Sequence, residues 1–244
     1  MKKMGFKERA KALCPDIRPG AATNNEEFWG ALYCRPSAYL FLVLFGDVTW
    51  LTPNLLTHIS NIFLVASAIL ILFPKYFILS AILMQLALTF DCADGQLARY
   101  RHNGSEVGSY YDKVTDYLGL ILIFSLLAWS AFQQTHRPVY MLLAMFALSG
   151  NMMTGYAKWV YASISKRLGI KEPVGTPYVS WWRILTRIVE FREPDIYLWL
   201  GIFLILGKPW LPLWVLGPAQ LLKGVFSTAY FGWRIHKHVK DSSE

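Results

Sequence analysis

Long apolar segments separated by short polar turns dominate the chain from residue 54 onward. A helix needs roughly 20 residues to cross the hydrocarbon layer of a membrane, which is about 30 Å thick. Several apolar segments reach or approach that length: residues 55–73, 76–90, 117–132 and 140–164. This pattern predicts an all-α integral membrane protein.

Proline and polar residues position the predicted helices. Pro53 and Asn54 form a helix start, in which proline fixes the backbone and Asn54 caps exposed amides. The apolar segment 37–50 is too short to span and contains Asp47, so we expect an amphipathic interfacial helix on the cytoplasmic leaflet. Six transmembrane helices are expected at 54–74, 76–99, 108–132, 140–166, 196–207 and 213–235.

Residues 194–238 can form either one span or two. A single crossing would place the basic segment 234–240 outside, against the rule that positive charge stays in the cytoplasm. Two spans are therefore preferred. We expect one membrane-embedded domain over 1–244, with a cytoplasmic or interfacial segment at 1–53 and a six-helix core at 54–238.

Charge refines the topology. The chain of 244 residues is 55% hydrophobic and 16% charged, and its net charge is +8. Most lysines and arginines fall on one side of the predicted spans, and only Lys75, Arg137 and Lys208 fall in the opposite loops. This asymmetry predicts a cytoplasmic location for the crowded side. It also accounts for the positive charge without nucleic acid as a partner.

Four aspartates interrupt the apolar pattern. Helical residues three, four and seven apart share a face, so Asp91 and Asp94 line one face of the second span, and Asp112 and Asp116 line one face of the third. A short loop joins these helices, which predicts antiparallel neighbours whose acidic faces meet. Buried carboxylates cost roughly 2.5 to 3.5 kcal/mol each near the membrane interior. Hard divalent cations such as Mg²⁺ or Ca²⁺ take oxygen ligands, and two ions would balance the four charges. We expect two ions of Mg²⁺ or Mn²⁺ as cofactors.

Small residues accompany the aspartates. Gly95, Ala98 and Gly108 lie on the same two faces and leave space that larger side chains would fill. Close helix packing is the alternative explanation for small residues in membranes. Their combination with four aspartates favours a ligand pocket.

These residues together resemble the CDP-alcohol phosphotransferase family. The pattern D-x-x-D-G-x-x-A-R, eight further residues and then G-x-x-x-D-x-x-x-D is met at every fixed position: Asp91, Asp94, Gly95, Ala98, Arg99, Gly108, Asp112 and Asp116. The motif covers 26 residues, and the six-span plan with an amino-terminal interfacial helix is also similar to this family.

The resemblance implies an enzyme in which an acceptor hydroxyl attacks the β-phosphorus of a CDP-alcohol and CMP is released. It implies that Asp91, Asp94 and Asp112 ligate the metals, and that Asp116 accepts the proton while also contacting a metal. The nucleotide would lie beside Asp94, Gly95, Ala98, Arg99 and Gly108. Asn54 follows Pro53 just before the first span, as in the family, and is a further nucleotide-binding candidate. The resemblance also implies a homodimer.

Three basic residues are candidates for the acceptor site. Lys158 lies about two turns inside the fourth span, where it either binds an anionic acceptor or balances the aspartates. Arg183 and Arg187 fall in a second predicted interfacial helix, 178–191, where contact with lipid headgroups explains them as well as phosphate binding does.

The expected reaction is phospholipid biosynthesis at the cytoplasmic face of the inner membrane or its equivalent. We expect CDP-diacylglycerol as the donor and a polyol or polyol phosphate, such as inositol phosphate or glycerol phosphate, as the acceptor. A CDP-choline or CDP-ethanolamine donor with a lipid acceptor is the alternative within this class. A cation transporter using the buried aspartates is the alternative from another class.

Overall fold

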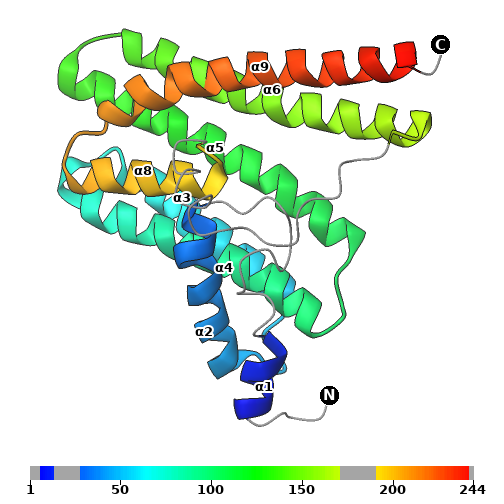
Figure 1. The fold of residues 1–244 in the computed structure, drawn as a ribbon. Helices are drawn as coiled ribbons and strands as arrows, with labels where there is room; N and C mark the ends of the chain where they lie inside the picture. The colour runs from blue at the N-terminus through cyan, green and yellow to red at the C-terminus, as the bar shows by residue number, and fades with distance from the viewer. Residues whose placement is uncertain (1–5, 14–27, 171–190, 242–244) are drawn as a thin grey trace. The chain divides into compact units, whose positions relative to one another are not determined.

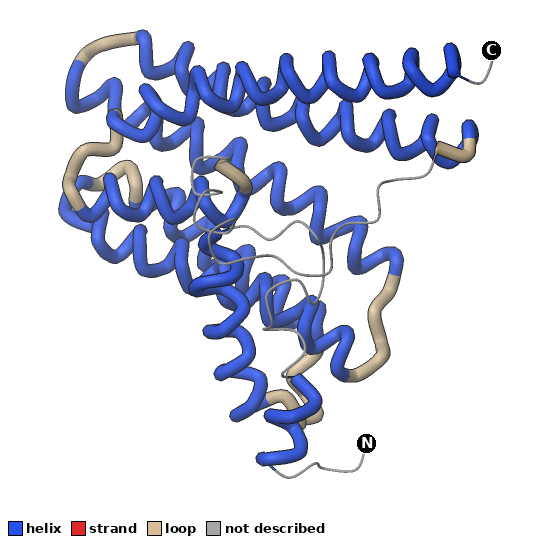
Figure 2. Tube along the Cα trace, viewed as in Figure 1, coloured by secondary structure: helices blue, strands red, loops and turns tan. Residues whose placement is uncertain are grey.

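The computed structural model describes residues 6–13, 28–170 and 191–241, and every regular element in those ranges is a helix (Figure 2). The chain divides into two compact units. The first comprises Met1–Leu127 and Thr176–Lys208, and the second comprises Ala128–Gly175 and Pro209–Glu244.

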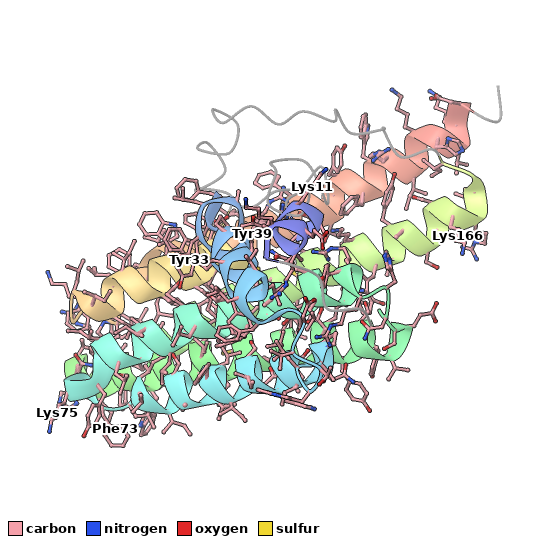
Figure 3. All side chains as sticks on the ribbon, turned by 90° about the horizontal axis from the view of Figure 1, so that it is seen from below. Lys11, Tyr33, Tyr39, Phe73, Lys75 and Lys166 are labelled. Carbon is pink, nitrogen blue, oxygen red and sulfur yellow. The ribbon has the colours of Figure 1, made fainter. Side chains whose placement is uncertain are left out.

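An antiparallel helix pair forms the centre of the first unit. α3 (Pro53–Leu70) packs along α4 (Phe77–Tyr100), and the single turn η3 (Pro74–Tyr76) joins them (Figure 1). Figure 3 shows Phe73 and Lys75 together at this turn, where the Lys75 ammonium lies 5.5 Å from the Tyr76 ring centre. Aromatic and basic residues of this kind suit the border between lipid and water.

Buried hydroxyl groups hold α3 to α4. Ser67 and Ser80 each donate a 2.8 Å hydrogen bond to the other's carbonyl oxygen, and Ser60 donates to the Ala87 carbonyl at 2.9 Å. Small side chains let the two backbones approach, and hydroxyl groups then bond across the contact. These hydrogen bonds therefore fix α3 and α4 relative to each other, and with them the residues at the end of the pair that contains Asp91 and Asp94.

The amino-terminal helices pack against α4. α1 (Phe6–Leu13) is followed by a π-helical turn, η2 (Gly30–Cys34), and by α2 (Arg35–Phe45). A helix thus covers most of the segment 37–50, but it begins earlier and ends at Phe45; its interfacial position stays a prediction. Asp47 lies in the turn that follows, where its carboxylate accepts from Tyr100 at 2.9 Å and pairs with Arg9 at 3.0 Å.

The turn after α2 is fixed by one arginine of the loop between α4 and α5. Arg101 donates to the carbonyl oxygens of Gly46, Val48 and Leu51. Its guanidinium group thereby satisfies main-chain acceptors that no helix uses. The helices α1, α2 and α4 also share a hydrophobic core, which includes Leu13, Leu42 and Leu97.

Two more helices complete the first unit. α5 (Glu106–Thr135) starts there, and its last turns belong to the second unit. Gly119 of α5 lies against α3, because a Cβ atom added at Gly119 would overlap the Leu64 side chain. α8 (Glu193–Ile205) packs on α4, and its Asp195 accepts a 2.8 Å hydrogen bond from the main-chain N–H of Trp29.

The second unit contains one closely packed helix pair. α6 (Val139–Leu168) runs along α9 (Leu211–Asp241) (Figure 1). A Cβ atom added at Gly150 would overlap the main chain of Gln220, and one added at Gly224 would lie 2.7 Å from the Gly150 carbonyl oxygen. These glycines serve close helix packing.

All six predicted spans are helical, with ends that differ by a few residues. Three helical segments in the described ranges are long and apolar enough to cross a membrane: Pro53–Leu70, Pro74–Tyr100 and Glu106–Thr135. The described part of the chain is therefore helical, and its long apolar helices indicate an integral membrane protein. The second predicted interfacial helix, at 178–191, lies outside the described residues except for its last position.

One predicted capping residue was wrong. Thr52, not Asn54, caps α3, because the Thr52 hydroxyl accepts from the main-chain N–H of Leu55 at 3.2 Å and Pro53 occupies the first helical position. A threonine directly before a proline is a favoured arrangement, since the proline has no N–H to satisfy. Asn54 is thus not needed for capping.

Candidate active site

Three of the four motif aspartates converge. Asp91 of α4 and Asp112 and Asp116 of α5 each offer a carboxylate oxygen, and these oxygens lie within 4.8 Å of one another. Oxygens that share one cation at about 2.1 to 2.4 Å lie at most about 4.2 to 4.8 Å apart. The three carboxylates therefore fit a common hard cation.

Helical spacing explains the contribution of α5 to this cluster. Asp112 and Asp116 are one turn apart on the same face, so one helix orientation presents both carboxylates to α4. Ser105 fixes the start of α5, because its hydroxyl accepts a 2.9 Å hydrogen bond from the main-chain N–H of Gly108. The start of the helix thereby determines the height at which both aspartates face Asp91.

Asp94 has a different environment. It lies nearly one turn after Asp91 on α4, its residue is only 8% exposed, and its Oδ2 atom accepts a short hydrogen bond from the Thr57 hydroxyl of α3. The Thr57 hydroxyl also lies 3.2 Å from the Pro53 carbonyl oxygen. Thr57 was not among the sequence candidates, because a threonine on an apolar helix carries no signal of its own.

The motif glycine at 95 is not explained by packing. A Cβ atom added there would meet only the Nη1 atom of Arg99, at 3.4 Å, and that side chain is exposed and flexible. Packing glycines behave differently, since a Cβ atom at Gly150 would overlap main-chain atoms. The space beside Gly95 is thus open, and the half-buried Ala98 lies nearly one turn farther along α4.

Gly108 and Asn54 approach each other from different helices. A Cβ atom added at Gly108 would lie 3.0 Å from the Ser105 hydroxyl oxygen and 3.8 Å from the Asn54 Oδ1 atom. The exposed Asn54 side chain is therefore brought to the start of α5. The Asn54 amide thus lies near the motif residue Gly108. From the sequence alone, only the resemblance to the family connected Asn54 with the motif.

A cavity of about 260 Å³ opens beside the aspartates within the first unit. Its polar lining includes Arg35, Asn61, Asp91, Asp116, Glu193 and Tyr197. Asp94, Gly95, Ala98 and Gly108 do not belong to the lining. Asp91 and Asp116 are thus accessible from a space that the motif residues Asp94, Gly95, Ala98 and Gly108 do not line.

Four of these lining residues were missed by sequence reasoning. Asn61 had a usable signal, because a polar side chain within an apolar membrane segment is costly and marks functional positions. Arg35, Glu193 and Tyr197 had none, since they lie far from the motif in sequence and belong to ordinary helices.

The three acceptor candidates are not part of this cluster as described. Lys158 lies in α6, in the second unit, and its side chain is exposed within the chain. Arg183 and Arg187 fall outside the described residues. Their role in acceptor binding stays a prediction.

Comparison with known proteins gives two matches. A family model described as CDP-alcohol phosphatidyltransferase matches residues 50–207, which is more than half of the chain. The chain is also similar to the bifunctional IPC transferase and DIPP synthase of Thermococcus kodakarensis, with 32% identity over 108 residues. That match covers 43% of this chain and 23% of the relative, so the shared region is about a quarter of the relative's length.

Proposed function

Because the chain belongs to the CDP-alcohol phosphatidyltransferase family, we propose that it transfers a substituted phosphate group from a CDP-alcohol to a hydroxyl acceptor and releases CMP. The observation that carries this proposal is the convergence of Asp91, Asp112 and Asp116 beside a polar cavity. Family membership makes the chain an enzyme and decides against the cation-transporter alternative.

The carboxylates are suited to divalent cations, on which enzymes of this family generally depend. Hard oxygen ligands favour Mg²⁺ or Mn²⁺. We propose that Asp91, Asp94, Asp112 and Asp116 hold two such ions, with Thr57 orienting Asp94. When bound, the ions neutralise charge on the diphosphate and polarise the transferred phosphoryl group.

Asp116 is the proposed base. It lines the cavity, so its carboxylate can accept the proton of an acceptor hydroxyl held there. The acceptor oxygen then forms a bond to the β-phosphorus while the bond from that phosphorus to the bridging oxygen breaks. The bridging oxygen leaves with CMP. Alignment of the two oxygens supplies much of the rate in such a transfer.

The nucleotide is proposed to lie on the side of Asp94. The open space at Gly95 and the half-buried Ala98 leave room for it, and Arg99 lies within reach of its phosphates. Gly108 and the Asn54 amide border the same region from α5 and α3. The proposed nucleotide site is thus formed by the first three long helices.

The substrates, topology and assembly follow from the sequence expectations. We propose CDP-diacylglycerol as the donor and a polyol or polyol phosphate as the acceptor, with a CDP-choline or CDP-ethanolamine donor as the alternative. Lys158, Arg183 and Arg187 are proposed to assist an anionic acceptor. We also propose that the chain forms one domain with six spans in the cytoplasmic membrane or its equivalent. Its active site is proposed to face the cytoplasm, and the protein to form a homodimer.

The test is CMP release by the purified protein in detergent. CDP-diacylglycerol and CDP-choline are each supplied with inositol phosphate, glycerol phosphate or diacylglycerol, with Mg²⁺ or Mn²⁺ present or absent. We expect metal-dependent CMP release with at least one pair. Asp116→Asn should abolish turnover and leave CDP binding intact. Absence of CMP with every donor would contradict the proposed activity, and loss of CDP binding in Asp116→Asn would contradict its role as base.

A further inference from the structure

The cavity in the first unit has a polar lining that the proposed catalytic steps do not fully use. Asp91 and Asp116 have roles in the reaction, but Arg35, Asn61, Glu193 and Tyr197 line the same space. These four residues come from α2, α3 and α8. A cavity of about 260 Å³ is slightly smaller than typical sites for drug-sized ligands, so it suits a compact polar group better than acyl chains.

Tyr197 presents a hydrogen-bonding group to the cavity. Its residue is only 3% exposed, and it lines the cavity. Among the residues that the structure describes, no hydrogen-bond partner is found for its hydroxyl group or for the Asn61 side chain. The Tyr197 hydroxyl is not among the buried polar atoms that lack a partner, so it is accessible from the cavity. A ligand hydroxyl in the cavity can therefore bond to it.

The wall that carries Tyr197 and Glu193 is held in place by hydrogen bonds behind it. Gln85 of α4 donates from Nε2 to the Tyr197 carbonyl at 3.1 Å and accepts from the Trp29 indole at 2.7 Å. The Trp29 main-chain N–H bonds to the fully buried Asp195. These contacts join α4, α8 and the segment before η2, so the cavity has a preorganised wall.

We infer that this cavity binds a compact polyol group and that Glu193 and Tyr197 determine its selection. The Glu193 carboxylate accepts hydrogen bonds from hydroxyl groups of the polyol, and Tyr197 and Asn61 bond to others. A phosphate on the polyol bonds to the Arg35 guanidinium, which suits phosphate oxygens. One hydroxyl or phosphoryl group of the bound polyol then lies beside Asp91 and Asp116. The inference rests on the proposed phosphotransfer.

The polyol can come from two sources, which the experiment separates. It is either the free acceptor or the alcohol part of a CDP-alcohol donor. The wild-type enzyme is assayed for CMP release with CDP-diacylglycerol or CDP-glycerol as donor, and with inositol 1-phosphate or glycerol 3-phosphate as acceptor. Steady-state KM values are measured for each substrate at a saturating concentration of the other.

The test variants are Glu193→Gln and Tyr197→Phe, and the matched control is Tyr140→Phe, which changes a buried tyrosine outside the cavity. We expect both test variants to raise one polyol KM about tenfold or more, because a site built to bond a hydroxyl loses that bond. A rise for inositol 1-phosphate identifies the acceptor. A rise for CDP-glycerol but not for CDP-diacylglycerol identifies the donor alcohol.

Arg35→Gln addresses the phosphate contact. It should raise the KM of a phosphorylated acceptor more than that of free inositol or glycerol. Thermal unfolding of each variant confirms that it is folded. An active wild-type enzyme whose KM values change no more in Glu193→Gln and Tyr197→Phe than in Tyr140→Phe would overturn the inference. A wild-type enzyme that releases no CMP would instead overturn the proposed function.

Discussion

Replacing Thr57 by valine tests whether α3 positions Asp94, one of the proposed metal-binding carboxylates. Valine keeps the size and the β-branching of threonine, so the helix and its packing should be preserved. It removes the hydroxyl group that bonds to the Asp94 Oδ2 atom. The variant therefore leaves Asp94 in place and takes away the contact that orients it.

The expected loss follows from the strength of that contact. A hydrogen bond to a charged group contributes about 1.5 to 3 kcal/mol, and Asp94 is only 8% exposed, so water replaces the hydroxyl poorly. Each 1.4 kcal/mol corresponds to about a factor of ten. If the contact serves the transition state, kcat/KM for the CDP-alcohol should fall about 10-fold to 100-fold.

The assay is initial-rate CMP release over a range of donor concentrations. Thr57→Ser keeps the hydroxyl and should retain most of the activity. Thr135→Val is the matched control, because the Thr135 hydroxyl also bonds to a carbonyl four residues earlier, at 2.7 Å, with no carboxylate partner. Wild-type kcat/KM in Thr57→Val would refute the reasoning, as would an equal loss in Thr135→Val.

Other changes separate packing from chemistry. Gly95→Ala should leave the melting temperature unchanged or slightly raised, since only the flexible Arg99 side chain is near the added Cβ atom. It should raise the donor KM several-fold, because the nucleotide is proposed to fill that space. A wild-type KM in this variant would count against a nucleotide there. Gly150→Ala should destabilise by about 1 to 3 kcal/mol through overpacking, whereas Gly232→Ala, with no atom near its added Cβ, should not, as measured by thermal unfolding in detergent. Chelation by EDTA should stop CMP release and added Mg²⁺ or Mn²⁺ should restore it; full activity after exhaustive chelation would argue against a metal-dependent reaction.

Local spacing explains why much of the architecture could be predicted. Apolar segments of nearly the length of a membrane span appear directly in the sequence, and each predicted span is a helix in the structure. Asp112 and Asp116 share a face because they are four residues apart, whatever the helix packs against. The prediction at Asn54 was wrong for an equally local reason, since Thr52 was the better placed cap before a proline.

The sequence alone determined that the chain is a helical membrane protein with acidic faces on two helices joined by a short loop, because helical periodicity and apolar length are properties of neighbouring residues. Only the tertiary structure decided that Asp91 joins Asp112 and Asp116 while Asp94 bonds to Thr57. It also decided that Glu193 and Tyr197 line the same cavity as Asp91. Those relations depend on how helices distant in the sequence are rotated and shifted against one another, and no periodicity within a single helix encodes that register.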